Sequence, residues 1–163
     1  QTTGLFFRKY LGRPGGNPNA TARSDLGWDN NQRIYRYAET LLNASELALR
    51  TGDNSKAQNY FQQVRDRAFK GNAPAKQVSL DNLLNERRLE FVGEGKRYYD
   101  LIRFGKAAEV LKPGGGKVLN AQKTAYDKQG IPERIQWTES KKYLPIPQGE
   151  VDAAQGTIVQ NPY

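Results

Sequence analysis

Cysteine, histidine and methionine are all absent from this chain of 163 residues. Without cysteine, the chain has neither a disulfide framework nor a thiol nucleophile. Without histidine it lacks the usual general base at neutral pH, and the two absences together remove the nitrogen and sulfur ligands of most zinc sites. We therefore predict that the chain is not an enzyme and that it requires no metal ion or other cofactor.

Long apolar runs are also missing. No stretch approaches the roughly 18 consecutive apolar residues of a membrane-spanning helix. The chain begins Gln1-Thr2-Thr3-Gly4, which has neither the basic region nor the apolar region of a signal peptide. An apolar content of 37% is enough for one modest core, so we predict a single domain over residues 1–163. The mean hydropathy of -0.82 fits either a protein with a large solvated surface or a piece of a longer one.

Positive charge is in excess, because 25 lysines and arginines stand against 17 aspartates and glutamates, giving a net charge of +8. Such an excess is found in proteins that bind nucleic acids or acidic surfaces. Here the basic residues are scattered from Arg8 to Lys142, many of them beside acidic residues, and no nucleic-acid-binding motif is present. We therefore expect a mildly basic, solvated surface and no nucleic-acid partner.

Two helical patterns follow a lead-in of residues 1–31 that is rich in glycine, proline and asparagine. The first pattern begins at Asp29 to Asn31, which offer N-cap acceptors, and ends at Gly52. The apolar positions of the two patterns are Ile34, Tyr37, Ala38, Leu41, Leu42, Ser45, Ala48 and Leu49, and then Ala57, Tyr60, Phe61, Val64 and Ala68. Their small residues would allow close approach, which predicts an antiparallel helical hairpin similar to a tetratricopeptide repeat.

A second helical pair is predicted between Ser79 and Leu111, so that residues 32–111 form helical hairpins. Ser79 would be the N-cap of its first helix, and Gly95 would end that helix. Residues 112–163 follow as a long loop and an extended strap, because Pro145 and Pro147 remove backbone donors from the sequence K-Y-L-P-I-P. A short last turn is expected at Glu150 to Ala154. The fold class is therefore all-α, tetratricopeptide-like, with long irregular loops.

Charged residues are concentrated among apolar ones between Asn85 and Lys106. One interpretation is a carboxylate cluster that binds metal or moves protons, as in a glycosidase. The other is a structural network in which arginines neutralise the carboxylates and fix how two helices cross, and the abundance of arginine favours it. The predicted members are Glu86, Glu90, Glu94, Arg87, Arg97, Asp100 and Arg103.

Aromatic residues in loops are the candidates for ligand binding. An exposed tryptophan or tyrosine gives the C–H face of a sugar a flat platform, and neighbouring polar groups bond its hydroxyls. Trp137, with Tyr126 nearby in sequence, and Trp28, beside Asp29 and Asn30, fit this description. The alternative for either tryptophan is that it caps the helical core.

Four motifs occur in one order along the chain. They are R-I-Y-R-Y-A-E-T-L-L-N-A-S-E from Arg33, E-R-R-L-E-F-V-G-E-G-K-R-Y-Y-D-L-I-R-F-G from Glu86, K-Y-L-P-I-P-Q-G-E-V from Lys142 and the terminal Q-N-P-Y from Gln160. Together they resemble the C-terminal part of the SusD/RagB family, glycan-binding outer-membrane lipoproteins of Bacteroidetes. The family's T-G-x-x-x-R-K-Y segment is also matched, from Thr3 to Tyr10.

The resemblance implies a C-terminal portion of a longer protein that is anchored by lipid on the outer face of the outer membrane. It implies oligosaccharide capture without catalysis, and delivery to a SusC-like TonB-dependent transporter. The matched motifs belong to the family's scaffold, so they assign no ligand residue. The alternative function is a tetratricopeptide-like interaction module that binds a peptide or a partner protein.

Overall fold

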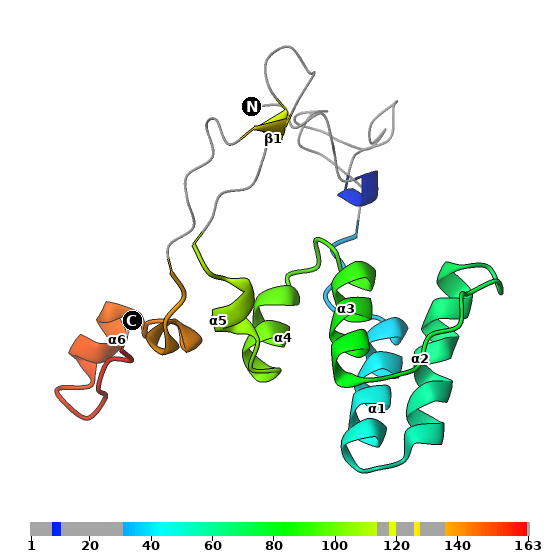
Figure 1. Cartoon of the computed structure of the whole chain (residues 1–163). Helices are drawn as coiled ribbons and strands as arrows, with labels where there is room; N and C mark the ends of the chain where they lie inside the picture. Colours follow the sequence, from blue (N-terminus) through cyan, green and yellow to red (C-terminus); the bar gives the residue numbers. More distant parts are fainter. Residues whose placement is uncertain (1–7, 11–30, 114–117, 120–125, 128–135, 163) are drawn as a thin grey trace. The chain divides into compact units, whose positions relative to one another are not determined.

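A computed structural model describes residues 8–10, 31–113, 118–119, 126–127 and 136–162 (Figure 1). The chain divides into two compact units between Asp100 and Leu101, and each unit is considered by itself. Within the described residues, no helix is both long and apolar enough to cross a bilayer. The elements are helical except for one pair of two-residue strands, which confirms the predicted all-α class.

The first unit is built on a hairpin of α1 (Tyr37–Arg50) and α2 (Asn54–Ala68). Leu42 and Phe61 are fully buried between these helices, as the spacing of apolar residues predicted. Ala57 is also fully buried, and its carbonyl oxygen accepts a 2.7 Å hydrogen bond from the hydroxyl of Ser45, itself fully buried. Small side chains on both helices therefore bring the backbone of α2 within reach of a side chain of α1.

The predicted start of the first helix at Asp29 to Asn31 is wrong. Residues 31–36 are not helical, and α1 begins at Tyr37 after an extended Arg36. Lys96 donates a 2.7 Å hydrogen bond to the carbonyl oxygen of Ile34, and Arg36 bonds to Glu94. These contacts hold the segment in an extended form and join residues about sixty positions apart, so a local helical pattern cannot reveal them.

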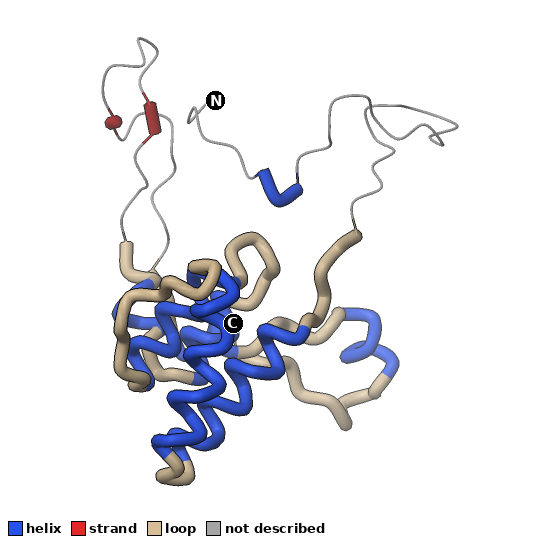
Figure 2. The backbone as a smooth tube through the Cα atoms, turned by 90° about the vertical axis from the view of Figure 1, so that its right-hand side faces the viewer, coloured by secondary structure: helices blue, strands red, loops and turns tan. Residues whose placement is uncertain are grey.

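α3 (Leu80–Glu90) packs against α1 and lies beside α1 and α2 in Figure 1. Figure 2 shows that the regular structure of the described residues is helical apart from the short strands. Its N-cap is Ser79, as predicted, whose hydroxyl accepts a 3.1 Å hydrogen bond from the backbone of Asn82. Gln58 of α2 ties down the preceding segment, because it accepts from the backbone nitrogen of Val78 and donates to the carbonyl oxygen of Lys76. The second helical pair thus starts directly against the first.

α3 ends at Glu90 and not at Gly95, as the sequence had suggested. Residues 91–95 form a turn in which Gly93 and Gly95 have φ values of +76° and +73°. An L side chain is strained in that conformation, so the two glycines permit the turn. α4 (Arg97–Arg103) follows it and crosses the boundary of the two units.

The second unit contains α5 (Ala107–Val110), the antiparallel strands β1 (Val118–Leu119) and β2 (Tyr126–Asp127), the 3-10 helix η2 (Glu139–Lys142) and α6 (Gln148–Ala153). The sequence did not predict the two strands. The strap is extended as predicted. Its Ile146 exchanges two 2.8 Å hydrogen bonds with the amide of Gln160, and Asn161 donates to the carbonyl oxygen of Leu144. The Q-N-P segment therefore folds back along the strap.

Candidate functional site

Glu94 is the centre of an ion-pair cluster on the turn after α3. Its side chain is 1% exposed and accepts hydrogen bonds from Lys9, in the short helix η1 (Arg8–Tyr10), and from Arg36. The Nε atom of Arg36 lies 3.1 Å and 3.0 Å from the two carboxylate oxygens. Burial raises the pKa of Glu94, but the hydrogen bonds from Arg36 and Lys9 outweigh it and hold that pKa below its usual value.

Arg36 joins Glu94 to Glu90. It donates to the side chain of Glu90 and, at 2.7 Å, to its carbonyl oxygen, while Arg67 of α2 lies 2.6 Å and 2.7 Å from the two carboxylate oxygens. Burial lowers the pKa of Arg36, but its hydrogen bonds to Glu94 and Glu90 raise it overall. The guanidinium also lies 4.9 Å from the centre of the Phe91 ring, which is cation–π distance.

Two further buried carboxylates of the first unit, Glu86 and Asp100, are paired separately. Glu86 accepts a 2.8 Å hydrogen bond from Arg65 of α2, and both side chains are 6% exposed. Arg87 donates at 2.9 Å to the buried carboxylate of Asp100 and at 2.7 Å to Asn43. Each pairing joins different helices, which is the structural arrangement that protein interiors require of buried charges.

The predicted cluster is thus divided among several partners. Its three glutamates are paired with cations from other segments. Within the described residues, Arg97 instead donates a 3.3 Å hydrogen bond to the carbonyl oxygen of Leu84. Arg103, in the second unit, stacks its guanidinium 4.6 Å from the Phe104 ring centre. Among the described residues, no three Asp, Glu, His or Cys side chains gather as a metal site would require.

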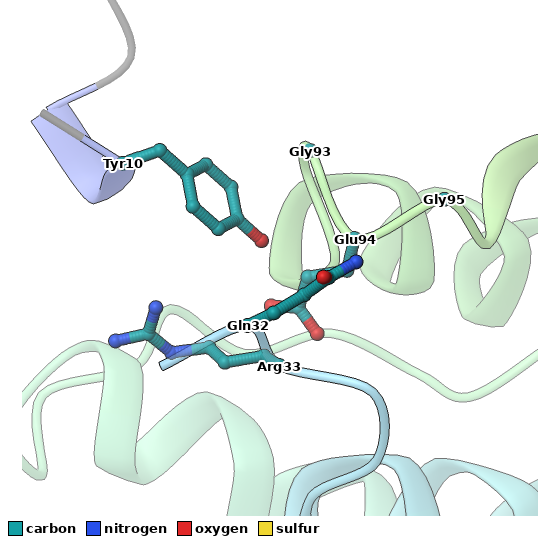
Figure 3. Close-up of a pocket in the computed structure, with 6 residues that line it drawn as sticks. All are labelled: Tyr10, Gln32, Arg33, Gly93, Glu94 and Gly95. Carbon is teal, nitrogen blue, oxygen red and sulfur yellow. The ribbon is translucent and has the colours of Figure 1, made fainter. Parts of the chain in front are cut away.

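A cavity of about 440 Å³ opens beside Glu94 (Figure 3). Tyr10 extends from η1 toward the turn of Gly93, Glu94 and Gly95, and the side chains of Gln32 and Arg33 lie across from it. The Tyr10 ring is close to the turn, because a Cβ atom on Gly93 would lie 2.9 Å from its Cε2 atom. The missing side chain of Gly93 therefore allows Tyr10 to form one wall.

The lining suits a small polar ligand. Tyr10 supplies an aromatic ring with a hydroxyl, Gln32 an amide and Arg33 a guanidinium, and both Gln32 and Arg33 are exposed. A ring beside hydrogen-bonding groups can contact the C–H face and the hydroxyls of a sugar. The sequence did not single out these three residues, although Tyr10 closes the T-G-x-x-x-R-K-Y segment and Arg33 opens the next motif. Only the fold brings the two motifs together.

The ligand residues predicted from the sequence lie elsewhere. Trp137 is 8% exposed and precedes η2, where the backbone carbonyl of Gln136 accepts a 2.7 Å hydrogen bond from Lys141. Tyr126 is in β2, but its side chain lies outside the described part of the chain, as does the whole of Trp28. Their proposed role in binding therefore stays a prediction.

Comparison with known proteins agrees with this architecture. Over 86% of its length the chain is similar to surface glycan-binding protein A from Bacteroides thetaiotaomicron, with 50% identity and a TM-score of 0.62. A structure of that protein in complex with laminarihexaose matches with 49% identity and a TM-score of 0.60. A SusD-like protein from Bacteroides fragilis matches 80% of the chain with 28% identity and a TM-score of 0.64.

Sequence relatives are of the same kind. SusD-like protein P38 of Formosa agariphila is 34% identical in an alignment of 99 residues that covers 54% of this chain and 20% of that protein. The chain spans about a quarter of the solved relatives, 26%, 27% and 25% of their length. The model of the SusD family matches residues 1–163. The chain belongs to the SusD family.

Proposed function

We propose that the protein containing this chain binds glycans at the cell surface without catalysing a reaction on them. The observation that carries this proposal is the 49% identity, over 86% of the chain, to a surface glycan-binding protein whose structure is a complex with laminarihexaose. The protein that contains this chain would be held by lipid on the outer face of the outer membrane and would pass oligosaccharides to a SusC-like TonB-dependent transporter. Membership of the SusD family supports both the anchoring and the delivery.

Among the cavities lined by described residues, the one beside Tyr10 is our candidate place for a saccharide ring. A sugar ring placed there would meet the aromatic ring of Tyr10, and its hydroxyls would reach Gln32 and Arg33. Trp137, Tyr126 and Trp28 remain the other proposed ligand residues. The burial of Trp137 leaves little of its ring available for stacking, which makes the Tyr10 cavity the first place to test.

Calorimetric titration with laminarihexaose, and with hexasaccharides of other linkages, tests the proposal. We expect saturable binding, weakened about tenfold in Tyr10→Ala by loss of a stacking contact worth about 1 to 1.5 kcal/mol. Tyr143→Ala is a matched control, because Tyr143 is an exposed aromatic residue outside the cavity. Circular dichroism would verify that both variants fold.

The titration separates the alternatives. Binding by the longer protein but not by this chain would place the glycan site in the remaining three quarters of the protein. Binding that is lost in Trp137→Ala and kept in Tyr10→Ala would move the site to the second unit. Absence of binding to every saccharide by both proteins would contradict glycan binding and favour the protein-interaction module.

A further inference from the structure

A second cavity, of about 360 Å³, opens at the same turn but has a different chemical character. Gly93 and Gly95 line both cavities. Four of the nine residues that line the second one are cationic, namely Arg87, Arg88, Lys96 and Arg97, and none is acidic. The remaining lining is mainly apolar, so this concave surface combines concentrated positive charge with little competing polarity.

Two of the four cations are already neutralised. Arg87 donates to the buried carboxylate of Asp100, and the ammonium nitrogen of Lys96 lies 3.0 Å from a carboxylate oxygen of Glu39. The carboxylates of Asp100 and Glu39 are thus engaged by these two cations. Arg87 and Lys96 therefore shape the cavity and contribute little net charge to it.

The other two cations, Arg88 and Arg97, are bonded to neutral groups. Arg88 donates at 3.2 Å and 2.9 Å to the side-chain oxygen of Asn85, and Arg97 donates at 3.3 Å to the carbonyl oxygen of Leu84. No ion pair of either arginine occurs among the described residues. Burial and the charge of Arg88 lower the pKa of Arg97 and outweigh the charge of Asp100, which raises it. The two guanidinium groups that face this cavity therefore repel one another.

We propose that this cavity is an oxyanion-binding site in which Arg88 and Arg97 bind a carboxylate or sulfate group. The guanidinium plane presents paired N–H donors that match the oxygens of such a group, and charge-assisted hydrogen bonds of this kind are the strong ones. An anion would also relieve the repulsion of the two arginines. The group can arrive as a free anion or as the acidic substituent of a saccharide, and the site requires only the shared oxyanion chemistry.

The test uses nuclear magnetic resonance of the full chain labelled with nitrogen-15. The chain is titrated with sodium sulfate and, separately, with sodium chloride at equal ionic strength. The amides of Gly93 and Gly95 and the side-chain Nε–H groups of Arg88 and Arg97 report binding. We expect their chemical shifts to change saturably with sulfate and not with chloride. Galacturonate is then compared with galactose, and saturation by galacturonate at a lower concentration than by sulfate would identify a saccharide source.

Three variants make the test specific. Arg88→Gln and Arg97→Gln should each weaken sulfate binding at least tenfold, while Arg97→Lys should keep part of it. Arg50→Gln is the matched control, since it removes one positive charge outside the cavity and should leave the affinity unchanged. Arg88 is exposed, so its variant carries the test if Arg97→Gln does not fold. Equal, unsaturated shifts with sulfate and chloride, or affinity unchanged in Arg88→Gln, would overturn the proposal.

Discussion

The guanidinium of Arg36 and the carboxylate of Glu94 are joined by two hydrogen bonds, 3.0 Å and 3.1 Å long, from one nitrogen to both oxygens. The two residues are 58 positions apart in the sequence. Their contact ties the segment that enters α1 to the turn that leaves α3. The candidate cavity lies beside this contact, so its walls depend on an ion pair and not only on apolar packing.

Replacing Arg36 by alanine should therefore destabilise the chain. Among the described residues, the change leaves the carboxylate of Glu94, 1% exposed, with Lys9 as its remaining cation, and Glu90 with Arg67 as its remaining cation. We expect a loss of about 2 to 3 kcal/mol in the free energy of unfolding, below the range for fully buried pairs because Arg36 is 24% exposed. Urea denaturation measures it. Arg33→Ala is the neighbouring control and should change stability by less than about 0.5 kcal/mol; equal effects of the two variants would contradict the role of Arg36.

Acid should weaken the same cluster. Because the pKa of Glu94 is held below its usual value in the folded chain, its ionised form contributes stability above the unfolded pKa of about 4.3. That contribution is lost as the pH falls through the lower, folded pKa. Glu94→Gln lacks it at every pH. The difference in unfolding free energy between the natural chain and Glu94→Gln should shrink as the pH falls below about 5, and a difference that stays constant would contradict the assignment.

Gly93→Ala should cost more stability than Gly52→Ala. Both glycines have positive φ, +76° and +88°, so each substitution carries a backbone penalty of about 1 to 2 kcal/mol. At Gly93 the new Cβ would also lie 2.9 Å from the ring of Tyr10, whereas nothing lies within 4 Å at Gly52. In a Tyr10→Ala background the excess cost at Gly93 should disappear. A double-mutant cycle on unfolding free energies would show it, and additive effects would exclude the contact.

Ala57→Leu should disrupt the hairpin of α1 and α2. Ala57 is fully buried, and Ser45 of α1 bonds to its carbonyl oxygen, so a larger side chain would push the helices apart and break that bond. We expect a loss of about 2 to 4 kcal/mol, combining the strain of overpacking with that of the broken hydrogen bond. Lys56→Leu, at the exposed neighbouring position, serves as the control. Thermal denaturation measures both variants. Similar midpoints for Ala57→Leu and Lys56→Leu would contradict close packing at Ala57.

The helices could largely be predicted from the sequence because their signals are local. Leu42 and Phe61 each belong to a series of apolar residues at helical spacing, and both are buried as predicted. Ser79 is both the predicted and the observed N-cap of α3. The start of α1 could not be predicted, since Arg36 and Ile34 are held extended by residues far along the chain. Local capping signals at Asp29 to Asn31 give no information about such contacts.

The site was harder to predict than the fold for the same reason. Glu86, Glu90 and Glu94 stood out by their spacing, but their partners Arg65, Arg67 and Arg36 come from other helices and segments. Tyr10 and Arg33 lie in separate motifs that meet only in the folded chain. A single sequence shows which residues are unusual, and it does not show which of them are neighbours.

Affinity electrophoresis tests the central claim, glycan binding, most directly. This chain and the longer protein that contains it would run through gels with and without laminarin and a panel of other polysaccharides, beside the Tyr10→Ala and Tyr143→Ala variants. The account predicts that at least one polysaccharide slows both proteins and that Tyr10→Ala reduces the effect in this chain. Unchanged migration of both proteins in every polysaccharide would contradict it.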